Sequence, residues 1–147
     1  MSLATSVLVR VVHVVGMALV FGGAASAWAA LRTPAAGATS GFDPVSLART
    51  YEWVFWGAMG AMVVTGVGNL GALGPPGPAS RWGTILTAKL VAIAVFVLGS
   101  FVRTLVVFRL GRDGSAGAGR SLLARSYGAT AGAVVILVSL AEVLAHG

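Results

Sequence analysis

The residues whose types could do chemistry are a few polar side chains that interrupt long apolar stretches. Lys89 lies inside the apolar run of residues 82–98. A charged side chain at the centre of a membrane-spanning helix costs about 2.5–3.5 kcal/mol on insertion scales, so such a residue usually has a partner or a function. The side chains that could meet Lys89 at a similar depth are His13, Asn69, Glu142 and His146.

The spacing of these polar residues places several of them on shared helix faces. Arg10, His13 and Met17 follow an i, i+3, i+7 pattern, and Glu142 and His146 follow an i, i+4 pattern, so each set shares one face of a helix. Apart from flanking arginines, we expect every strongly polar side chain within the apolar segments to lie in one half of an antiparallel bundle. The residues that would meet there are His13, Met17, Thr65, Asn69, Lys89, Glu142 and His146.

The composition is that of a membrane protein. Of the 147 residues, 57% are hydrophobic and only 10% are charged, whereas soluble proteins average about 25% charged residues. The four apolar segments, residues 3–31, 51–73, 82–108 and 122–144, are each long enough for a transmembrane helix, which needs about 20 residues. We predict an all-α fold, in which residues 1–147 form a single four-helix transmembrane domain. The chain has no cysteine, which excludes disulfides and thiolate metal ligands.

The basic residues predict the orientation in the membrane. The arginines that would gather on one side are Arg32, Arg49, Arg103, Arg109, Arg112, Arg120 and Arg125. Because cytoplasmic segments are enriched in Arg and Lys, we expect this side to face the cytoplasm and both termini to lie outside. We therefore expect a multi-pass protein of the inner (plasma) membrane. Topology explains the net charge of +6, so the expected partners are the lipid bilayer, a second copy of the chain or a larger membrane complex, and no nucleic acid.

Turn and glycine patterns add local expectations. Asp43 followed by Pro44 is typical of an N-cap and a first helical residue, and it predicts a short interfacial helix before the second apolar segment. The basic, glycine-rich residues 111–120 predict a flexible connection. Spacings that predict close contact between helices occur at Gly22-Gly23, Gly57-x-x-Gly60 and Gly128-x-x-x-Gly132.

Each site residue also has a purely structural interpretation. A single histidine on an apolar face is often a hydrogen-bonded core residue, which applies to His13, and Lys89 could extend its ammonium to the membrane surface. Met17 could serve only as packing. Arg10 is either an interface anchor or a group that faces an anion, and His146 is the penultimate residue.

Three stretches resemble the copper-resistance D (CopD) family. Residues 9–23, with Arg10, His13 and the pair Gly22-Gly23, are similar to the opening helix of that family. Thr65-Gly66 resembles its Thr/Ser-Gly motif, and residues 82–90, Trp-Gly-Thr-Ile-Leu-Thr-Ala-Lys-Leu, resemble its Trp-Gly and Lys-Leu signature. The resemblance implies a four-helix membrane unit associated with copper uptake or tolerance. It also implies that His13 and Lys89 are site residues and that Met17 contributes less.

A second resemblance, to the HemJ-type protoporphyrinogen oxidases, suggests a different cofactor. These haem-associated membrane proteins have a histidine on the first helix and a lysine after a tryptophan on the third, and His13 and Lys89 match that arrangement. The residues at the end of the first apolar segment, 28–33, differ from that family, so we rank it second.

The sequence thus leaves three functions open. The first is copper binding or transport, with His13, Met17 and His146 as metal ligands and with Asn69, Thr65 and Glu142 as a supporting polar network. The second is a protein that binds haem b, with His13 as the axial ligand and Lys89 and Arg10 paired with the propionates. The third is a structural subunit of a larger membrane complex. For the copper-binding and structural functions we expect no enzymatic activity. If the haem-binding protein is an enzyme, we expect a haem-dependent oxidoreductase.

Overall fold

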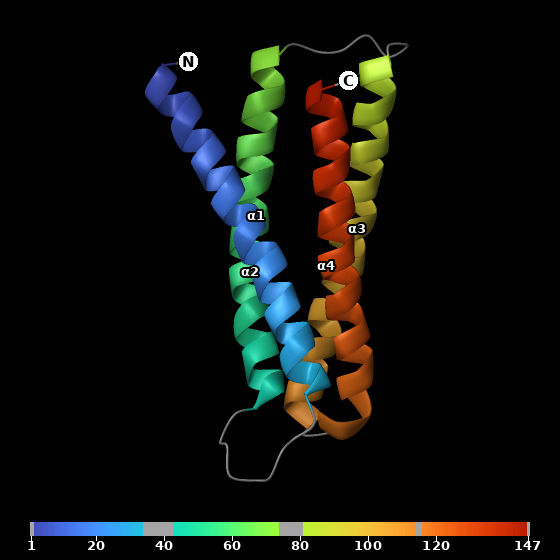
Figure 1. Cartoon of the computed structure of the whole chain (residues 1–147). Coiled ribbons are helices and arrows are strands. Elements are labelled where there is room, and N and C mark those ends of the chain that lie inside the picture. The colour runs from blue at the N-terminus through green and yellow to red at the C-terminus, as the bar shows by residue number, and fades with distance from the viewer. Residues whose placement is uncertain (1, 34–42, 74–80, 114–115, 147) are drawn as a thin grey trace.

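The computed structural model describes residues 2–33, 43–73, 81–113 and 116–146, and these are almost entirely helical. The helices are α1 (Leu3–Arg32), α2 (Pro44–Leu73), α3 (Arg81–Asp113) and α4 (Ala116–His146) (Figure 1). The all-α prediction is confirmed. Three helices contain stretches that are long and apolar enough to cross a membrane, namely Leu3–Arg32, Trp82–Leu110 and Gly119–Val143. The chain is therefore a membrane protein, while the role of α2 as a fourth span remains a prediction.

The helices pack in their order along the chain, and the last one closes on the first. α1 packs against α2 and α4, and α3 packs against α2 and α4. Neighbouring helices run antiparallel, so both termini lie at the same end (Figure 1). We call this the terminal end. We call the opposite end, where α1 and α3 finish and α2 and α4 begin, the arginine end.

Two expectations about helix boundaries are wrong. The side chain of Asp43 caps α2, because its carboxylate accepts hydrogen bonds from the backbone N–H groups of Val45 (3.0 Å) and Ser46 (3.1 Å). The helix that begins there is not a short interfacial one, since α2 continues without a break to Leu73. Most of the stretch 111–120 is helical rather than a flexible connection, because α3 extends through Asp113 and α4 begins at Ala116. Residues 114–115 lie outside the described residues.

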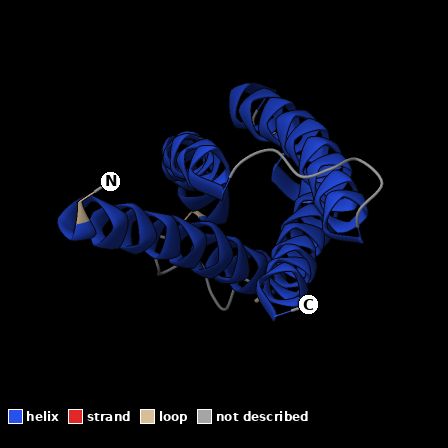
Figure 2. Cartoon of the chain, turned by 90° about the horizontal axis from the view of Figure 1, so that it is seen from above, coloured by secondary structure: helices blue, strands red, loops and turns tan. Residues whose placement is uncertain are grey.

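The hydrophobic core is concentrated toward the arginine end. Every buried residue of α1 lies at or after Gly16, and the first half of this helix leans away from α4 (Figures 1 and 2). At the centre of the core, the ring of Tyr51 makes edge-to-face contacts with Phe55 and Tyr127, with centroids 5.9 and 5.7 Å away. The Tyr51 hydroxyl donates a hydrogen bond of 2.6 Å to the carbonyl of Val20. α1 is therefore attached to α2 by both packing and a buried polar contact.

Arg120 attaches the end of α1 to α4. Its Nε donates to the carbonyl of Leu31 (2.9 Å), and its Nη2 donates to the carbonyls of Ala30 and Thr33. The last carbonyls of a helix have no partners within the helix and carry partial negative charge. A guanidinium from the neighbouring helix thus completes the hydrogen bonding of this helix end.

Some of the glycines allow close contact between helices, as predicted, and others do not. A Cβ atom at Gly23 would overlap the ring of Tyr51, and one at Gly128 would lie 3.0 Å from the indole of Trp28. At Gly16, a Cβ would lie 2.8 Å from Cγ of Met62. No atom lies within 4 Å of a Cβ built at Gly22, Gly57, Gly60 or Gly132, so within a single copy of the chain these four have no packing requirement for glycine.

We predict that Gly23→Ala destabilises the bundle and that Gly22→Ala does not. The added methyl group at residue 23 would push the Tyr51 ring away and break its hydrogen bond to Val20, which corresponds to a loss of about 1–3 kcal/mol for an overpacked core. The neighbouring substitution enters open space and replaces glycine with a better helix former, so stability stays constant or rises by up to about 1 kcal/mol. Thermal unfolding in detergent tests both variants, and equal midpoints would contradict the packing described here.

Candidate functional site

His13 lies in the first half of α1, where it contacts α2. Its Nδ1 lies 3.0 Å from Oγ1 of Thr65. Thr65 is buried, with 8% of its surface exposed, and His13 is half-buried. Two residues that the sequence placed in the same half of the bundle are thus in direct contact.

The hydrogen bonds of the Thr65 hydroxyl determine which ring nitrogen of His13 carries the proton. The Thr65 hydroxyl has one proton, and backbone carbonyl oxygens lie at 2.8 Å (Ala61) and 3.1 Å (Met62). When the hydroxyl donates to a carbonyl, it can only accept from the imidazole. Nδ1 then carries the proton, and Nε2 keeps a free lone pair that can coordinate a metal ion. Among the described residues, the structure records no hydrogen-bond partner for Nε2 of His13.

The methionines near His13 pack against the core. Met59 is buried, and Met17 and Met62 are partly buried against the same cluster. Met17 lies one turn after His13 on α1, so it shares the helix face of the histidine. A thioether is a soft ligand that suits Cu(I), so packing does not exclude a second role for Met17.

The remaining predicted site residues are distributed around the terminal half. Lys89 on α3 is half-buried and close enough to His13 to interact with it electrostatically. Arg10 on α1 and Glu142 on α4 are exposed, and a pair between Lys89 and Glu142 stays a prediction. The side chains of Asn69 and His146 lie outside the described part of the structure. Within the described part, no three His, Cys, Asp or Glu side chains form a metal-binding group.

A second polar group lies deeper, toward the arginine end, and sequence reasoning missed it. Glu52 of α2 and Arg103 of α3 form a buried salt bridge, with each side chain 1% exposed. Nε of Arg103 donates to Oε1 of Glu52 (2.8 Å) and Nη2 donates to Oε2 (3.1 Å). Such paired bonds between guanidinium and carboxylate are among the strongest hydrogen bonds in proteins.

Hydroxyl groups complete the hydrogen bonding of this ion pair. Tyr127 of α4 donates to Oε1 of Glu52 (2.7 Å), and Thr104 donates to Oε2. Nη1 of Arg103 donates to the hydroxyl of Thr130, also on α4. We call these five residues, Glu52, Arg103, Thr104, Tyr127 and Thr130, the ion-pair cluster. In the described part of the chain, no buried side-chain nitrogen or oxygen lacks a hydrogen-bond partner.

Aromatic rings surround the guanidinium of Arg103. Its central carbon lies 4.4 Å from the ring centroid of Phe55 and 4.9 Å from that of Tyr127. The indole N–H of Trp56 extends the network by donating to Thr104 (3.0 Å). A cation over an aromatic face is stabilised by the ring quadrupole, so the rings offset part of the cost of moving this charge out of water.

The ion-pair cluster corrects the expectation that polar side chains within the apolar segments lie only in the terminal half. It also corrects the assignment of Arg103 to the flanking arginines, because this side chain is buried and paired. The sequence held a partial signal, because Glu52 lies at the start of one apolar segment and Arg103 lies within another. A charged side chain within such a segment usually has a partner.

The chain was compared with known proteins, and no family model, curated protein or solved structure matches it.

We predict that Arg103→Met strongly destabilises the protein. The substitution leaves the carboxylate of Glu52 buried without its cation, which typically costs about 3–5 kcal/mol. Arg109→Met is the matched control, since Arg109 is an exposed arginine on the same helix, and its effect should stay within about 0.5 kcal/mol.

The double variant Glu52→Met, Arg103→Met tests whether the two residues act as a pair. Replacing both charges with apolar groups removes the uncompensated carboxylate, so the double variant should be more stable than Arg103→Met alone. Unfolding in detergent measures the stability of Arg103→Met, Arg109→Met and the double variant. A loss of stability in Arg103→Met no larger than that in Arg109→Met would contradict the role of the ion pair.

Proposed function

We propose that this protein is a CopD-like membrane protein that binds copper through His13 in the terminal half of the bundle. The observation that carries the proposal is the contact between His13 and Thr65. Histidines that bind metals usually have their second ring nitrogen hydrogen-bonded to another group, which fixes the tautomer and the ring orientation. Thr65 is placed to do this for His13 before any metal arrives.

The proposed topology is four spans with both termini outside the cytoplasm. α2 is 30 residues long and packs along α1 and α3, so it has the length and position of a fourth span. The charged residues support the orientation, because six of the eight arginines outside the ion-pair cluster lie at one end, and only Arg10 and Arg81 lie toward the other. Those at the arginine end are Arg32, Arg49, Arg109, Arg112, Arg120 and Arg125. The positive-inside rule places this end in the cytoplasm, so His13 lies in the outer half of the membrane.

The residues near His13 favour Cu(I) over Cu(II). Nε2 of His13 and the thioether of Met17 are ligand types that suit Cu(I). The ammonium of Lys89 interacts with His13 and repels a bound cation, and this repulsion is half as large for a single charge as for a double one. Pairing of Lys89 with Glu142 would reduce it further. In this proposal copper is the cargo, and the protein supplies its ligands.

A second candidate is a b-type haem protein, and the position of Lys89 favours it. A lysine near the only histidine with a described side chain could pair with a haem propionate, while Nε2 of His13 served as an axial ligand. Arg10 lies one turn before His13 and could bind the other propionate. Residues 28–33 differ from the corresponding stretch of the HemJ-type proteins, so we rank haem below copper.

We predict that His13→Ala abolishes Cu(I) binding and that Thr65→Val weakens it about 10–100-fold, which is the usual effect of removing the group that orients a metal-binding histidine. Thr87→Val is the control, because the Thr87 hydroxyl bonds only to the carbonyl of Gly83 (2.8 Å) on its own helix. Competition with a chromophoric Cu(I) chelator measures the three affinities. Unchanged affinity in His13→Ala would rule out the proposed site.

An absorption spectrum separates copper from haem. We predict that the detergent-purified protein has no Soret band and that dithionite causes no sharpening of visible bands. A Soret band that is lost in His13→Ala would replace copper with haem as the ligand. If neither haem nor Cu(I) binds a stably folded protein, the polar residues have only a structural function.

A further inference from the structure

We propose that a pocket between α1 and α4 at the arginine end binds the phosphate headgroup of an anionic phospholipid. The pocket has a volume of about 410 Å³ and is lined by Trp28, Leu31 and Arg32 of α1 and by Ser121, Ala124 and Arg125 of α4. The inference is independent of copper binding at His13, which lies in the other half of α1.

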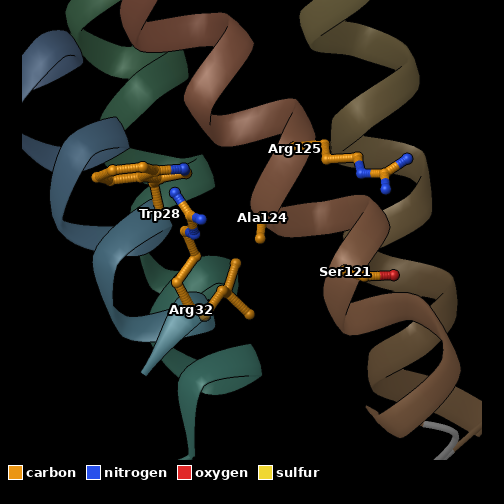
Figure 3. Close-up of a pocket in the computed structure, with 6 residues that line it drawn as sticks. Trp28, Arg32, Ser121, Ala124 and Arg125 are labelled. Atoms are coloured by element: carbon orange, nitrogen blue, oxygen red, sulfur yellow. The ribbon is translucent and has the colours of Figure 1, made fainter. Parts of the chain in front are cut away.

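Trp28 and Arg32 form a preorganised cationic wall of this pocket. The guanidinium carbon of Arg32 lies 5.0 Å from the ring centroid of Trp28, and Figure 3 shows the guanidinium beside the indole, facing Ala124. The indole itself is held against α4, because Gly128 leaves room for it. Stacking therefore restrains the guanidinium, while its N–H groups remain free to bind an anion.

Arg125 of α4 also lines the pocket and adds a second positive charge at this end of the bundle. Figure 3 shows Ser121 and Arg125 projecting from the side of α4 that faces away from Trp28. Arg125 is exposed, and its long side chain can turn toward an anion in the groove. The side chain of Ala124, on the part of α4 that faces Arg32, is small (Figure 3). The guanidinium of Arg32 is thus placed to meet a phosphate group that arrives from outside the bundle, and Arg125 adds positive charge beside it.

Among the described side chains, no acidic group neutralises the charges around the pocket. No acidic side chain lines it. Glu52 is bound to Arg103 within the core, and Asp43 caps α2. Arg120, on the same helix as Arg125, is bound to the carbonyls of α1. Within the described part of the structure, the positive charge of Arg32 and Arg125 is therefore available to an external anion.

The position and lining of the pocket favour a lipid over a soluble anion. Trp28 and Leu31 provide an apolar surface next to the guanidiniums, which suits a ligand with both a phosphate and a hydrocarbon part. Both arginines lie near the ends of helices that can cross a membrane. Basic pockets between transmembrane helices on the cytoplasmic side are known to bind anionic headgroups.

Native mass spectrometry of the detergent-purified protein, titrated with phosphatidylglycerol or with phosphatidylcholine, tests the proposal. We expect the first phosphatidylglycerol to bind more tightly than phosphatidylcholine. Arg32→Gln and Arg125→Gln should each weaken this binding about fivefold, and the double variant about 25-fold. Both residues are exposed, so the variants should fold, and their melting temperatures check this.

Arg109→Gln is the matched control, because it removes an exposed arginine from the same end of the bundle but outside the pocket. It should leave the first binding event unchanged. Equal losses in Arg109→Gln and Arg32→Gln would show general charge attraction and overturn the proposal. Millimolar inorganic phosphate should not displace the lipid, and displacement at that concentration would overturn the assignment to a lipid headgroup.

Discussion

The structure depends on one buried ion pair, between Glu52 and Arg103. Moving two charges out of water costs several kcal/mol for each ion, and the attraction between them offsets this only if the geometry is good and every remaining donor and acceptor is used. The geometry here is good, since the guanidinium makes two bonds to the carboxylate, Tyr127 donates to Glu52 and Arg103 donates to Thr130. Each buried nitrogen and oxygen of the described side chains has at least one hydrogen-bond partner. These requirements fix how α2, α3 and α4 are placed relative to one another, because a shift of one helix would leave a charge without its partner. The bond from Tyr51 to Val20 then attaches α1 to the same region.

This arrangement divides the bundle into two halves with different properties. Toward the arginine end, the buried polar side chains of the ion-pair cluster are paired with one another, and aromatic rings pack around them. Toward the terminal end, α1 has no buried residue before Gly16, and His13 uses one ring nitrogen on Thr65. A coordination site needs rigid support on one side and an accessible ligand atom on the other. In the proposed copper site, the contact with Thr65 orients the His13 ring, and Nε2 is the ligand atom.

Much of the fold could be predicted from the sequence, because long apolar segments and arginine-rich ends are local signals. The meeting of His13 and Thr65 was also predictable, since antiparallel helices bring residues at similar depth together. The ion-pair cluster was harder, because Glu52 lies beside aromatic residues that resemble a membrane interface and Arg103 lies near other arginines that do flank the helix. Which side chains point inward depends on the rotation of each helix about its axis. That rotation is set by contacts such as Gly23 with Tyr51, which join residues far apart in the sequence.

The availability of Nε2 of His13 for copper can be measured directly. The chain has two histidines, so a long-range nitrogen–proton NMR spectrum of protein labelled with ¹⁵N-histidine contains two imidazole patterns, and His146→Gln assigns them. We expect the His13 ring to carry its proton on Nδ1 in the metal-free protein, and the Nε2 resonance to shift when one equivalent of Cu(I) is added. A proton on Nε2 in the metal-free protein, together with no shift on addition of Cu(I), would contradict the proposed function.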